Sequence, residues 1–514
     1  MSLPDWLDPL YEAAEMRAVD KWAIEEQDVP SLDLMERAAG GLARATARVA
    51  RDGPIRVVCG KGNNGGDGLA AARLLREEGR EVDVLCTAPL DELQGDARAN
   101  LERLPGPQPE PFEPGQLSLD GSGAVVDALL GTGFEGEPRE PAVGAIAAIN
   151  AQDAPVVACD VPSGVNASTG EVEGEAVEAD VTATFHGPKV GLYVAPGAEH
   201  AGQVEVVEIG IPRGAPGAAS LGLISERVLE LFPRRGRASS KFGSGVVVVA
   251  GGSMGLTGAP AMAAMSAQRA GAGYVQVAVP GSVQPAIDLR LLEQMSRGLP
   301  DEDGAHTPQG ADDVEELAEG AGAVVLGPGI GRSDGAFEFA REVARRVGTP
   351  LLIDADGLNA LAHRLHTLRG RDAATVLTPH AGELSRLLGT DSDDIGRNRL
   401  ARARDAADLS GAVVLLKGDD TIVAAPGGAV AVSPGGTPAL ATAGTGDVLS
   451  GLIGALLAKG MPPFEAAALG TLAHVRAGFA AAGRFGADHV IAGDVIDALP
   501  AGLASRSVRS PRHA

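Results

Sequence analysis

One structural device occurs twice in this chain and most constrains its fold. A short valine-rich run leads into a glycine-rich stretch and then into an alanine-rich segment with helical periodicity, first at 55–78 and again at 246–270. A buried strand, a tight glycine loop and a helix, in that order, open a doubly wound parallel sheet. The sequence therefore predicts an α/β protein with two doubly wound domains, each with helices on both faces of its sheet.

Further strand-like runs follow each copy of the device, and the chain of 514 residues is too long for one core. In the first half we predict strands at Ile55–Cys59, Val82–Cys86, Ala124–Leu129, Pro155–Cys159 and Val204–Ile209. In the second half we predict them at Val246–Ala250, Ala323–Leu326, Pro350–Asp354, Thr375–Leu377 and Ala412–Leu416. A stretch rich in Gly, Pro and Ala lies between the two sets, so we expect domains at 1–215 and 225–514.

The charge balance excludes several classes of partner. The formal net charge is −25 and only 3% of the residues are aromatic, which disfavours binding to nucleic acid or to an anionic membrane surface. A nucleotide site in such a chain must attract phosphate through backbone N–H groups, a lysine or bound cations. We therefore expect small-molecule substrates, and the sequence leaves the oligomeric state open.

The cysteines and the apolar segments indicate a cytoplasmic protein. Cys59, Cys86 and Cys159 lie in or beside strand-like runs, an odd and sparse set that predicts buried, reduced thiols. The first fifteen residues are acidic and lack the features of a signal peptide. The apolar stretch at 448–458 is too short to span a bilayer.

The segment 60–68, GKGNNGGDG, is the sharpest local feature of the first half. Gly60, Gly62 and Gly65 fit a phosphate-binding glycine pattern between a strand and a helix. The acidic residue that a dehydrogenase carries at the end of its second strand is missing, because Asp83 lies inside that strand. A tight turn would also require the glycines, but it would not explain three crowded polar side chains, those of Asn63, Asn64 and Asp67.

Two more polar loops follow strands, at 127–133 and 160–164. The carboxyl ends of parallel strands share one crevice, so these loops are expected to converge. They would bring together Asn64, Asp127 and Ser163, whose oxygens suit a hard cation such as K⁺ or Mg²⁺. Asp160 would remain as an acid/base group. Taken singly, each acidic residue could instead be a turn or helix-cap residue.

The motifs NNGGDG, DALLGTG, DVPSGV and FHGPKVGL, spread over residues 10–212, resemble the NAD(P)H-hydrate epimerase domain. The resemblance implies a Rossmann-like three-layer domain, a K⁺ site at Asn64, Asp127 and Ser163, and a proton shuttle at Asp160, with Lys189 as a second candidate. It implies that the hydrated dinucleotide contacts Asn63, Asn64, Gly65, Gly66, Asp67, Gly131, Thr132, Gly133, Phe134, Glu135, Gly136, Glu137 and Asp160.

The second half carries a different set of strand-end motifs. TAGTGD at 442–447 precedes an apolar helical run, so backbone N–H groups at 444–446 can form an anion hole with Asp447 beside it. Asp447 could activate a hydroxyl for attack on phosphorus, or it could simply cap the helix. Lys417 and Thr421 offer a cation and a hydroxyl to a nucleotide, and His380 could orient a substrate or serve as a turn residue. No Walker A pattern is present.

The motifs GGSMGLTGAP, GPGIG, DADGLNAL, TPHAGE, KGDDT and TAGTGD, over about residues 225–505, resemble the ADP-dependent NAD(P)H-hydrate dehydratase domain, which has a ribokinase-like three-layer fold. The resemblance implies substrate contacts at Ala259, Gly329, His380 and Asp447, with Asp447 as the base. It implies ADP as co-substrate, Mg²⁺ as the metal, and nucleotide contacts at Lys417, Gly418, Asp419, Asp420, Thr421 and Gly446.

Together the two halves resemble the bifunctional NAD(P)H-hydrate repair enzymes. The resemblance implies that one domain interconverts the R and S forms of hydrated NAD(P)H. The other dehydrates the S form to NAD(P)H while ADP becomes AMP and phosphate. Two alternatives stay open: a small-molecule kinase of the hydroxymethylpyrimidine or thiazole type, and a non-catalytic first half that only binds a dinucleotide or a protein partner.

Overall fold

The computed structural model describes residues 3–112, 119–212, 214–215, 219–237 and 239–505. The chain divides into two compact units, each described by itself below. The first comprises Pro9–Leu221, and the second comprises Gly222 onward together with Pro4–Asp8. The chain's first strand, β1 (Leu7–Leu10), lies beside β9 (Leu221–Ile224) at one edge of the second unit's sheet.

The first unit is built on a seven-stranded sheet in the order β4-β3-β2-β5-β6-β7-β8, and all of its strand pairs are parallel. Its strands are β2 (Ile55–Cys59), β3 (Val82–Cys86), β4 (Glu110–Pro111), β5 (Ala124–Ala128), β6 (Val156–Cys159), β7 (Val181–Phe185) and β8 (Gln203–Val207). Strand order reverses between β2 and β5, where Val58 pairs with Asp127. Doubly wound sheets bind their ligands outside the strand ends at such a switch point.

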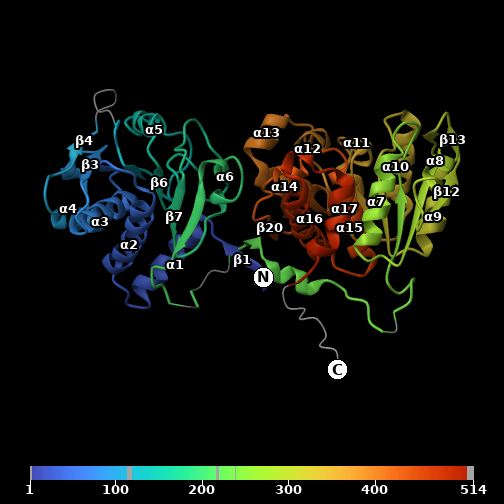
Figure 1. The fold of residues 1–514 in the computed structure, drawn as a ribbon, viewed down its shortest axis with the longest axis horizontal. Coiled ribbons are helices and arrows are strands. Elements are labelled where there is room, and N and C mark those ends of the chain that lie inside the picture. Colours follow the sequence, from blue (N-terminus) through green and yellow to red (C-terminus); the bar gives the residue numbers. More distant parts are fainter. Residues whose placement is uncertain (1–2, 113–118, 213, 216–218, 238, 506–514) are drawn as a thin grey trace. The chain divides into compact units, whose positions relative to one another are not determined.

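Helices cover both faces of this sheet (Figure 1). The larger core lies between one face and the helices α1 (Ala13–Glu25), α2 (Ser31–Val49), α3 (Asn63–Glu77) and α4 (Gly95–Arg103). A second core lies between the other face and α5 (Ala142–Asn150). Short helical turns, η1 (Leu90–Glu92), η2 (Val190–Leu192) and α6 (Gly197–His200), complete the unit.

The second unit is built on an eleven-stranded sheet in the order β1-β9-β20-β19-β18-β17-β16-β15-β10-β11-β12. The strands from β18 to β12 pair in parallel, whereas β19 pairs antiparallel with β18 and β20. The bounds are β10 (Val246–Ala250), β11 (Tyr274–Pro280), β12 (Met295–Leu299), β15 (Ala323–Leu326), β16 (Leu351–Ile353), β17 (Thr375–Leu377), β18 (Val413–Leu416), β19 (Ile422–Ala424) and β20 (Val430–Val432). A separate hairpin pairs β13 (Asp301–Glu302) with β14 (Ala305–His306).

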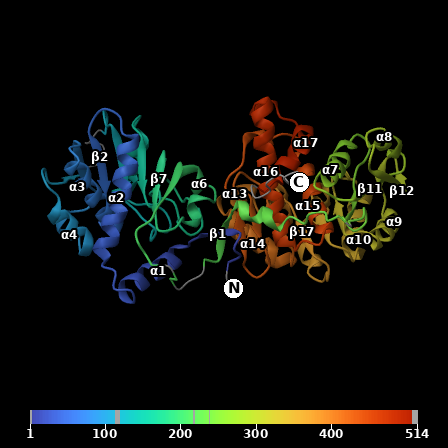
Figure 2. The same cartoon turned by 60° about the horizontal axis from the view of Figure 1, so that its bottom comes forward.

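Helices also cover both faces of the second sheet (Figure 2). One layer contains α7 (Gly258–Arg269), α15 (Thr445–Ala458), α16 (Pro463–Phe485) and α17 (Ala492–Gly502). The other contains α9 (Gly310–Glu319), α10 (Asp334–Arg346), α11 (Asp356–Asn359), α12 (Ala381–Leu388), α13 (Ser392–Arg397) and α14 (Arg399–Ser410), with α8 (Gln284–Asp288) beside β12. The remaining turns are η3 (Glu226–Leu231), η4 (Leu365–Leu368), η5 (Pro438–Leu440) and η6 (Ala487–His489). The prediction of an α/β protein with two doubly wound units is confirmed.

Two glycine motifs lie in helices rather than in the loops where they were expected. α3 begins at Asn63, so NNGGD forms its first turns, and α15 begins at Thr445, so Asp447 lies in its first turn. At Gly65 the packing explains the glycine, because a Cβ atom would lie 1.9 Å from the carbonyl oxygen of Gly60. Backbone N–H groups of a first helical turn have no partner within the helix and can face a ligand.

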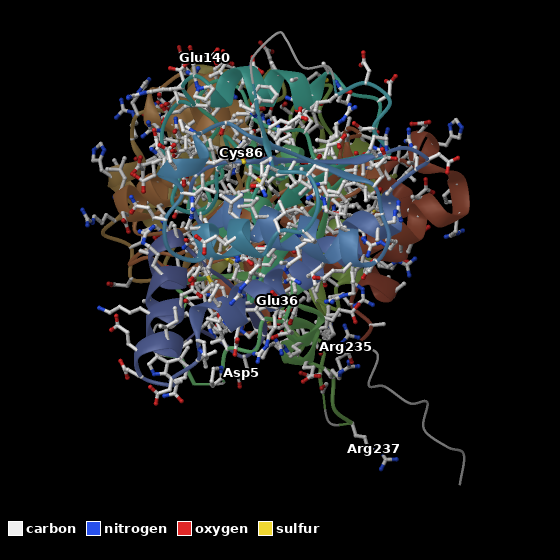
Figure 3. The ribbon with its side chains drawn as sticks, turned by 90° about the vertical axis from the view of Figure 1, so that its left-hand side faces the viewer. Asp5, Glu36, Cys86, Glu140, Arg235 and Arg237 are labelled. Atoms are coloured by element: carbon white, nitrogen blue, oxygen red, sulfur yellow. The ribbon has the colours of Figure 1, made fainter. Side chains whose placement is uncertain are left out.

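The prediction of reduced thiols is confirmed for all three cysteines, which are free and buried. Cys86, labelled in Figure 3, lies at the end of β3 opposite Cys59 of β2. No helix in the described part of the chain is both long enough and apolar enough to cross a membrane.

Candidate active sites

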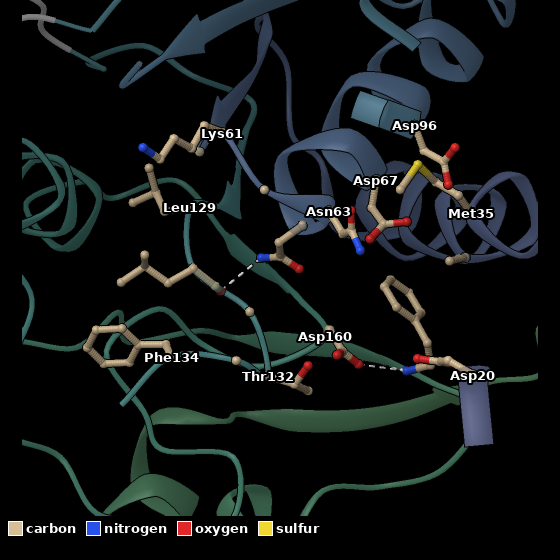
Figure 4. A pocket seen from close by; sticks show the side chains of 18 of the residues that line it. Asp20, Met35, Lys61, Asn63, Asp67, Asp96, Leu129, Thr132, Phe134 and Asp160 are labelled. Atoms are coloured by element: carbon tan, nitrogen blue, oxygen red, sulfur yellow. Dashed lines mark hydrogen bonds between the residues drawn. The ribbon is translucent and has the colours of Figure 1, made fainter. Parts of the chain in front are cut away.

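A cavity of about 980 Å³ lies in the first unit, at the carboxyl ends of β2, β5 and β6 (Figure 4). The loops that follow β2 and β5 form one wall, and residues of α1, α2 and α4 form another. The predicted contacts that line the cavity are Asn63, Asn64, Asp67, Gly131, Thr132, Gly133, Phe134 and Asp160. Five other predicted contacts are not among its lining residues: Gly65, Gly66, Glu135, Gly136 and Glu137.

The three predicted cation ligands of the first unit lie in one hydrogen-bonded network. Asp127 is fully buried, and its carboxylate accepts hydrogen bonds from the Ser163 backbone N–H (2.8 Å) and hydroxyl (2.6 Å). The Leu130 backbone N–H donates to the Ser163 hydroxyl (2.9 Å), and Asn64 Nδ2 donates to the Leu130 carbonyl (2.9 Å). The structure thus gathers Asn64, Asp127 and Ser163 around Leu130.

This network offers oxygen ligands around a single carboxylate. Burial raises the pKa of Asp127 to about 6, against the hydrogen bonds from Ser163 and Leu129 that favour its charged form. Within the described residues, Asp127 forms no ion pair with a lysine or arginine. No cluster of three His, Cys, Asp or Glu side chains in the described ranges could hold a metal. A cation here would therefore be held by uncharged oxygens and one carboxylate, the oxygen donors that hard cations prefer.

Asp160 and Lys189 form a buried ion pair at the floor of the cavity. Lys189 Nζ donates to Asp160 Oδ1, to the Thr184 hydroxyl (3.0 Å) and to the Phe185 carbonyl (2.8 Å), and only 1% of the residue is exposed. The same Asp160 oxygen accepts hydrogen bonds from the Phe185 backbone N–H (3.0 Å) and the Thr184 hydroxyl (3.1 Å). Asp160 also adopts a left-handed backbone conformation with φ +66°. Lys189 is thus no surface lysine, since it holds the Asp160 carboxylate in one position.

Two further carboxyl groups face the same space. Asp67 comes from the first turns of α3, and Asp20 comes from α1, which the sequence analysis did not assign (Figure 4). Burial raises the pKa of Asp20 to about 6, with Lys189 opposing and Asp160 adding to the shift. Burial, followed by the charges of Asp160 and Asp20, raises the pKa of Asp67 well above its ordinary value. The cavity therefore holds a carboxylate–lysine ion pair beside two carboxyl groups whose pKa values are raised.

In the second unit, Lys417 lies between two carboxylates. Its Nζ donates to Asp354 Oδ1 (2.8 Å) and lies 3.6 Å from Glu383 Oε2. The Ser450 hydroxyl donates to the other oxygen of Asp354 (2.6 Å) and also bonds the Gly446 carbonyl (3.1 Å). Burial alone would lower the pKa of Lys417, but the negative charge of Asp354 and, to a smaller extent, that of Glu383 raise it. Asp354, Glu383 and Ser450 had no predicted role.

Asp447 lies in the first turn of α15, next to this charged group. Burial and the negative charge of Asp354 raise the pKa of Asp447 to about 7, with Lys417 acting in the opposite direction. A Cβ atom on the neighbouring Gly446 would lie 3.7 Å from Lys417 Nζ, so the lysine and the start of α15 are adjacent. A carboxylate that titrates near neutral pH, beside a lysine and free backbone N–H groups, can accept a proton near a bound phosphate.

Hydrogen bonds within the predicted nucleotide loop and to neighbouring segments hold this loop in place. Arg399 Nε donates to Asp420 Oδ2 (2.8 Å), and both side chains are buried. The Thr421 hydroxyl donates to the Gly418 carbonyl (2.7 Å), and Asp419 accepts from the Gly436 backbone N–H (2.8 Å). Asp420 therefore fixes the shape of the loop through its ion pair with Arg399.

The remaining predicted substrate contacts lie in separate places around this region. Gly329 is next to Ala259, since a Cβ atom at Gly329 would lie 3.2 Å from that of Ala259. His380 Nδ1 accepts the Gly382 backbone N–H (3.0 Å) and so caps α12, the turn role left open by the sequence. Burial and the nearby Lys417 lower the pKa of His380, which keeps its ring neutral.

Comparisons with known proteins agree with the two-unit architecture. The family model for the YjeF-related protein N-terminus matches residues 31–191, and the family model for NAD(P)H-hydrate dehydratase matches residues 247–501. An ADP/ATP-dependent NAD(P)H-hydrate dehydratase from Bacillus subtilis, crystallised with ATP/Mg²⁺, is 28% identical. The similarity covers 55% of this chain and 96% of that protein, with a TM-score of 0.48.

Two curated relatives match over nearly the whole chain, and both are named bifunctional NAD(P)H-hydrate repair enzymes. The protein from Salinibacter ruber is 41% identical over 97% of this chain and 96% of its own length. The protein from Moorella thermoacetica is 40% identical over 96% of both chains. With both families matched in order along one polypeptide, this chain belongs to the family of bifunctional NAD(P)H-hydrate repair enzymes.

Proposed function

We propose that the first unit interconverts the R and S epimers of hydrated NAD(P)H, and that the second unit dehydrates the S epimer to NAD(P)H with ADP as phosphoryl donor. One observation carries the proposal. Each unit has its own acid/base carboxylate beside a lysine, Asp160 with Lys189 and Asp447 with Lys417, at the carboxyl ends of its parallel strands. Together with the two family matches, this supports two acid/base reactions on one metabolite.

Epimerisation needs a group that moves a proton to and from the C6 hydroxyl. The hydroxyl of the hydrate is next to the ring nitrogen, whose lone pair assists its departure as water. Water then returns to the opposite face of the ring. Asp160, held by Lys189 and Thr184, can take the proton from the incoming water.

Asn64, Asp127, Ser163 and the Leu130 carbonyl would hold K⁺ beside this cavity. A bound K⁺ supplies positive charge to a site whose surroundings are acidic, and so favours a diphosphate ligand. The network also joins the loops after β2, β5 and β6. We propose that it fixes the positions of those loops around the dinucleotide.

Dehydration begins with activation of the same hydroxyl. Asp447 accepts the hydroxyl proton as the oxygen attacks the terminal phosphorus of ADP, and AMP leaves. Lys417 and the first backbone N–H groups of α15 face the charge on the phosphoryl group. The new C6–O–phosphate bond then breaks with loss of a proton from C5, which restores the reduced nicotinamide ring.

Mg²⁺ would enter this second site on the nucleotide. In the described ranges no three acidic or His/Cys side chains form a metal-binding cluster, so the phosphates themselves supply most of the ligands. When bound, Mg²⁺ neutralises charge on the transferred group. We also propose ADP as the donor, K⁺ and Mg²⁺ as the bound cations, and a cytoplasmic location.

The test uses the S epimer of hydrated NADH with Mg²⁺ and either ADP or ATP. We expect the absorbance of reduced nicotinamide to return, with one equivalent of phosphate released per NADH and AMP formed from ADP. A small-molecule kinase would instead leave a stable phosphorylated product and no absorbance. Separately, chromatography of the epimers without nucleotide tests the first unit, because a module that only binds would never equilibrate them.

A further inference from the structure

The stereochemistry of epimerisation requires more than Asp160. The hydroxyl leaves from one face of the ring and water adds to the other, so protons are exchanged on two sides of the substrate. A carboxylate that is fixed by Lys189, Thr184 and the Phe185 backbone N–H cannot move from one face to the other. A second acid/base group on another wall of the cavity would meet this requirement.

Asp67 lies in that position. It projects from α3, whereas Asp160 follows β6, and Figure 4 shows the two carboxyl groups directed into the same space from different elements. Only 8% of Asp67 is exposed, and within the described residues it forms no ion pair. We propose that Asp67 is the second catalytic acid/base group of the epimerase, which protonates the departing hydroxyl while Asp160 deprotonates the incoming water.

The surroundings of the two carboxyl groups differ. Burial, Asp160, Asp20 and Asp96 raise the pKa of Asp67, with only Lys189 opposing them. Asp160 instead has Lys189 as an ion-pair partner. Two carboxyl groups whose environments separate their protonation states are the usual arrangement for an acid and a base in one active site.

The proton balance of this scheme is complete. The C6–O bond breaks, the ring nitrogen lone pair forms a C=N bond, and the Asp67 proton converts the leaving hydroxide to water. A second water then forms a C6–O bond on the other face, the electron pair returns to nitrogen, and Asp160 takes the proton. Asp67 is left charged and Asp160 protonated, the state that converts the opposite epimer by the reverse steps or resets through solvent.

The inference rests on the proposed epimerase function, and the test separates the two. The full chain and its Asp67→Asn variant are given the R epimer of hydrated NADH, and both epimers are quantified over time. We expect Asp67→Asn to slow catalysed interconversion by about 100-fold or more, the usual contribution of general acid catalysis. Failure of the unaltered chain to interconvert the epimers would contradict the proposed function itself.

A structural role for Asp67 would give a different result. In the proposed role, the wild-type rate falls at alkaline pH as Asp67 loses its proton, and Asp67→Asn removes this decline. Dehydration of the S epimer by the same variant stays at the wild-type rate, and an undiminished melting temperature of the first unit shows that this unit is folded. Asp83→Asn, an exposed carboxylate of β3 away from the cavity, is the matched control and keeps its rate. Wild-type epimerisation by Asp67→Asn, or an unchanged alkaline decline, would overturn the assignment.

Discussion

Lys417 Nζ donates a 2.8 Å hydrogen bond to Asp354 Oδ1, and the Ser450 hydroxyl holds the other oxygen of the same carboxylate at 2.6 Å. Asp354 is 2% exposed, so its charge acts through little intervening water. This buried carboxylate both orients the lysine and raises the pKa of Asp447. The geometry of the dehydratase site therefore depends on a residue that we do not expect to touch the substrate.

Asp354→Asn tests this relationship. Removal of one negative charge lowers the pKa of Asp447, so the acid limb of the dehydration rate moves to lower pH. Loss of a charge-assisted hydrogen bond to Lys417 raises the KM for the nucleotide by about tenfold. Ser450→Ala removes a hydrogen bond without removing a charge, and its acid limb stays close to that of the wild type. An unmoved acid limb in Asp354→Asn would contradict the electrostatic role.

Asp447→Asn is expected to abolish dehydration and to stabilise the second unit at high pH. The folded-state pKa of Asp447 is about 7, above its ordinary 3.8, so the folded chain binds this proton more tightly than the unfolded chain. The contribution of this bound proton to the free energy of unfolding is lost as pH rises from about 4 to 7. After allowance for solvent screening, we expect a gain of about 1–2 kcal/mol for the variant at pH 8. Urea unfolding at pH 8 and pH 4 checks this, because the gain should vanish at the lower pH.

Lys189→Met is expected to destabilise the first unit by about 3–5 kcal/mol at pH 7, because it leaves the buried Asp160 carboxylate without a partner. Thermal unfolding at pH 7 measures the effect. The double variant Asp160→Asn/Lys189→Met should be more stable than Lys189→Met alone, and a further loss of stability would contradict this interpretation.

The first unit is expected to bind K⁺ through the network around Leu130. Replacing Na⁺ by K⁺ should raise the melting temperature of that unit, and Ser163→Ala should remove most of the gain because it deletes one oxygen ligand. Asp180→Asn serves as a control, since its carboxylate bonds the Val156 backbone elsewhere in the unit. An equal response to both cations in the wild type would exclude a selective K⁺ site.

Sequence patterns located ten of the twenty strands in the described part of the chain, but not every helix start. Ile55–Cys59 and Val246–Ala250 were predicted to the residue, because buried parallel strands are continuous apolar runs. β7 (Val181–Phe185) was not predicted, since two threonines interrupt its apolar character. The helix at α3 was expected to begin after the glycine motif. Polar residues and glycines disfavour helix locally, and the close approach of Gly65 to Gly60 overrides that preference.

Site residues whose motif indicated a ligand or an acid/base group were predicted. Residues that only the packing of the fold brings into the site were missed. Asn64, Asp127 and Ser163 meet because three strand ends converge, which the alternation of strands and helices predicts. Asp20 lies on α1, far from Asp160 in sequence, and only the packing of α1 brings it to the cavity. Asp354 is the first residue of the motif DADGLNAL and directly follows β16, but nothing in the sequence indicated that Lys417 would bond it.

The most direct test gives the chain a single substrate, the R epimer of hydrated NADH, together with ADP and Mg²⁺. We predict full return of NADH absorbance with the wild type. Asp160→Asn should recover NADH only at the rate of spontaneous epimerisation, and Asp447→Asn should accumulate the S epimer without forming NADH. Equal behaviour of the two variants, or no NADH from the wild type with either ADP or ATP, would contradict a chain that carries two sequential repair activities.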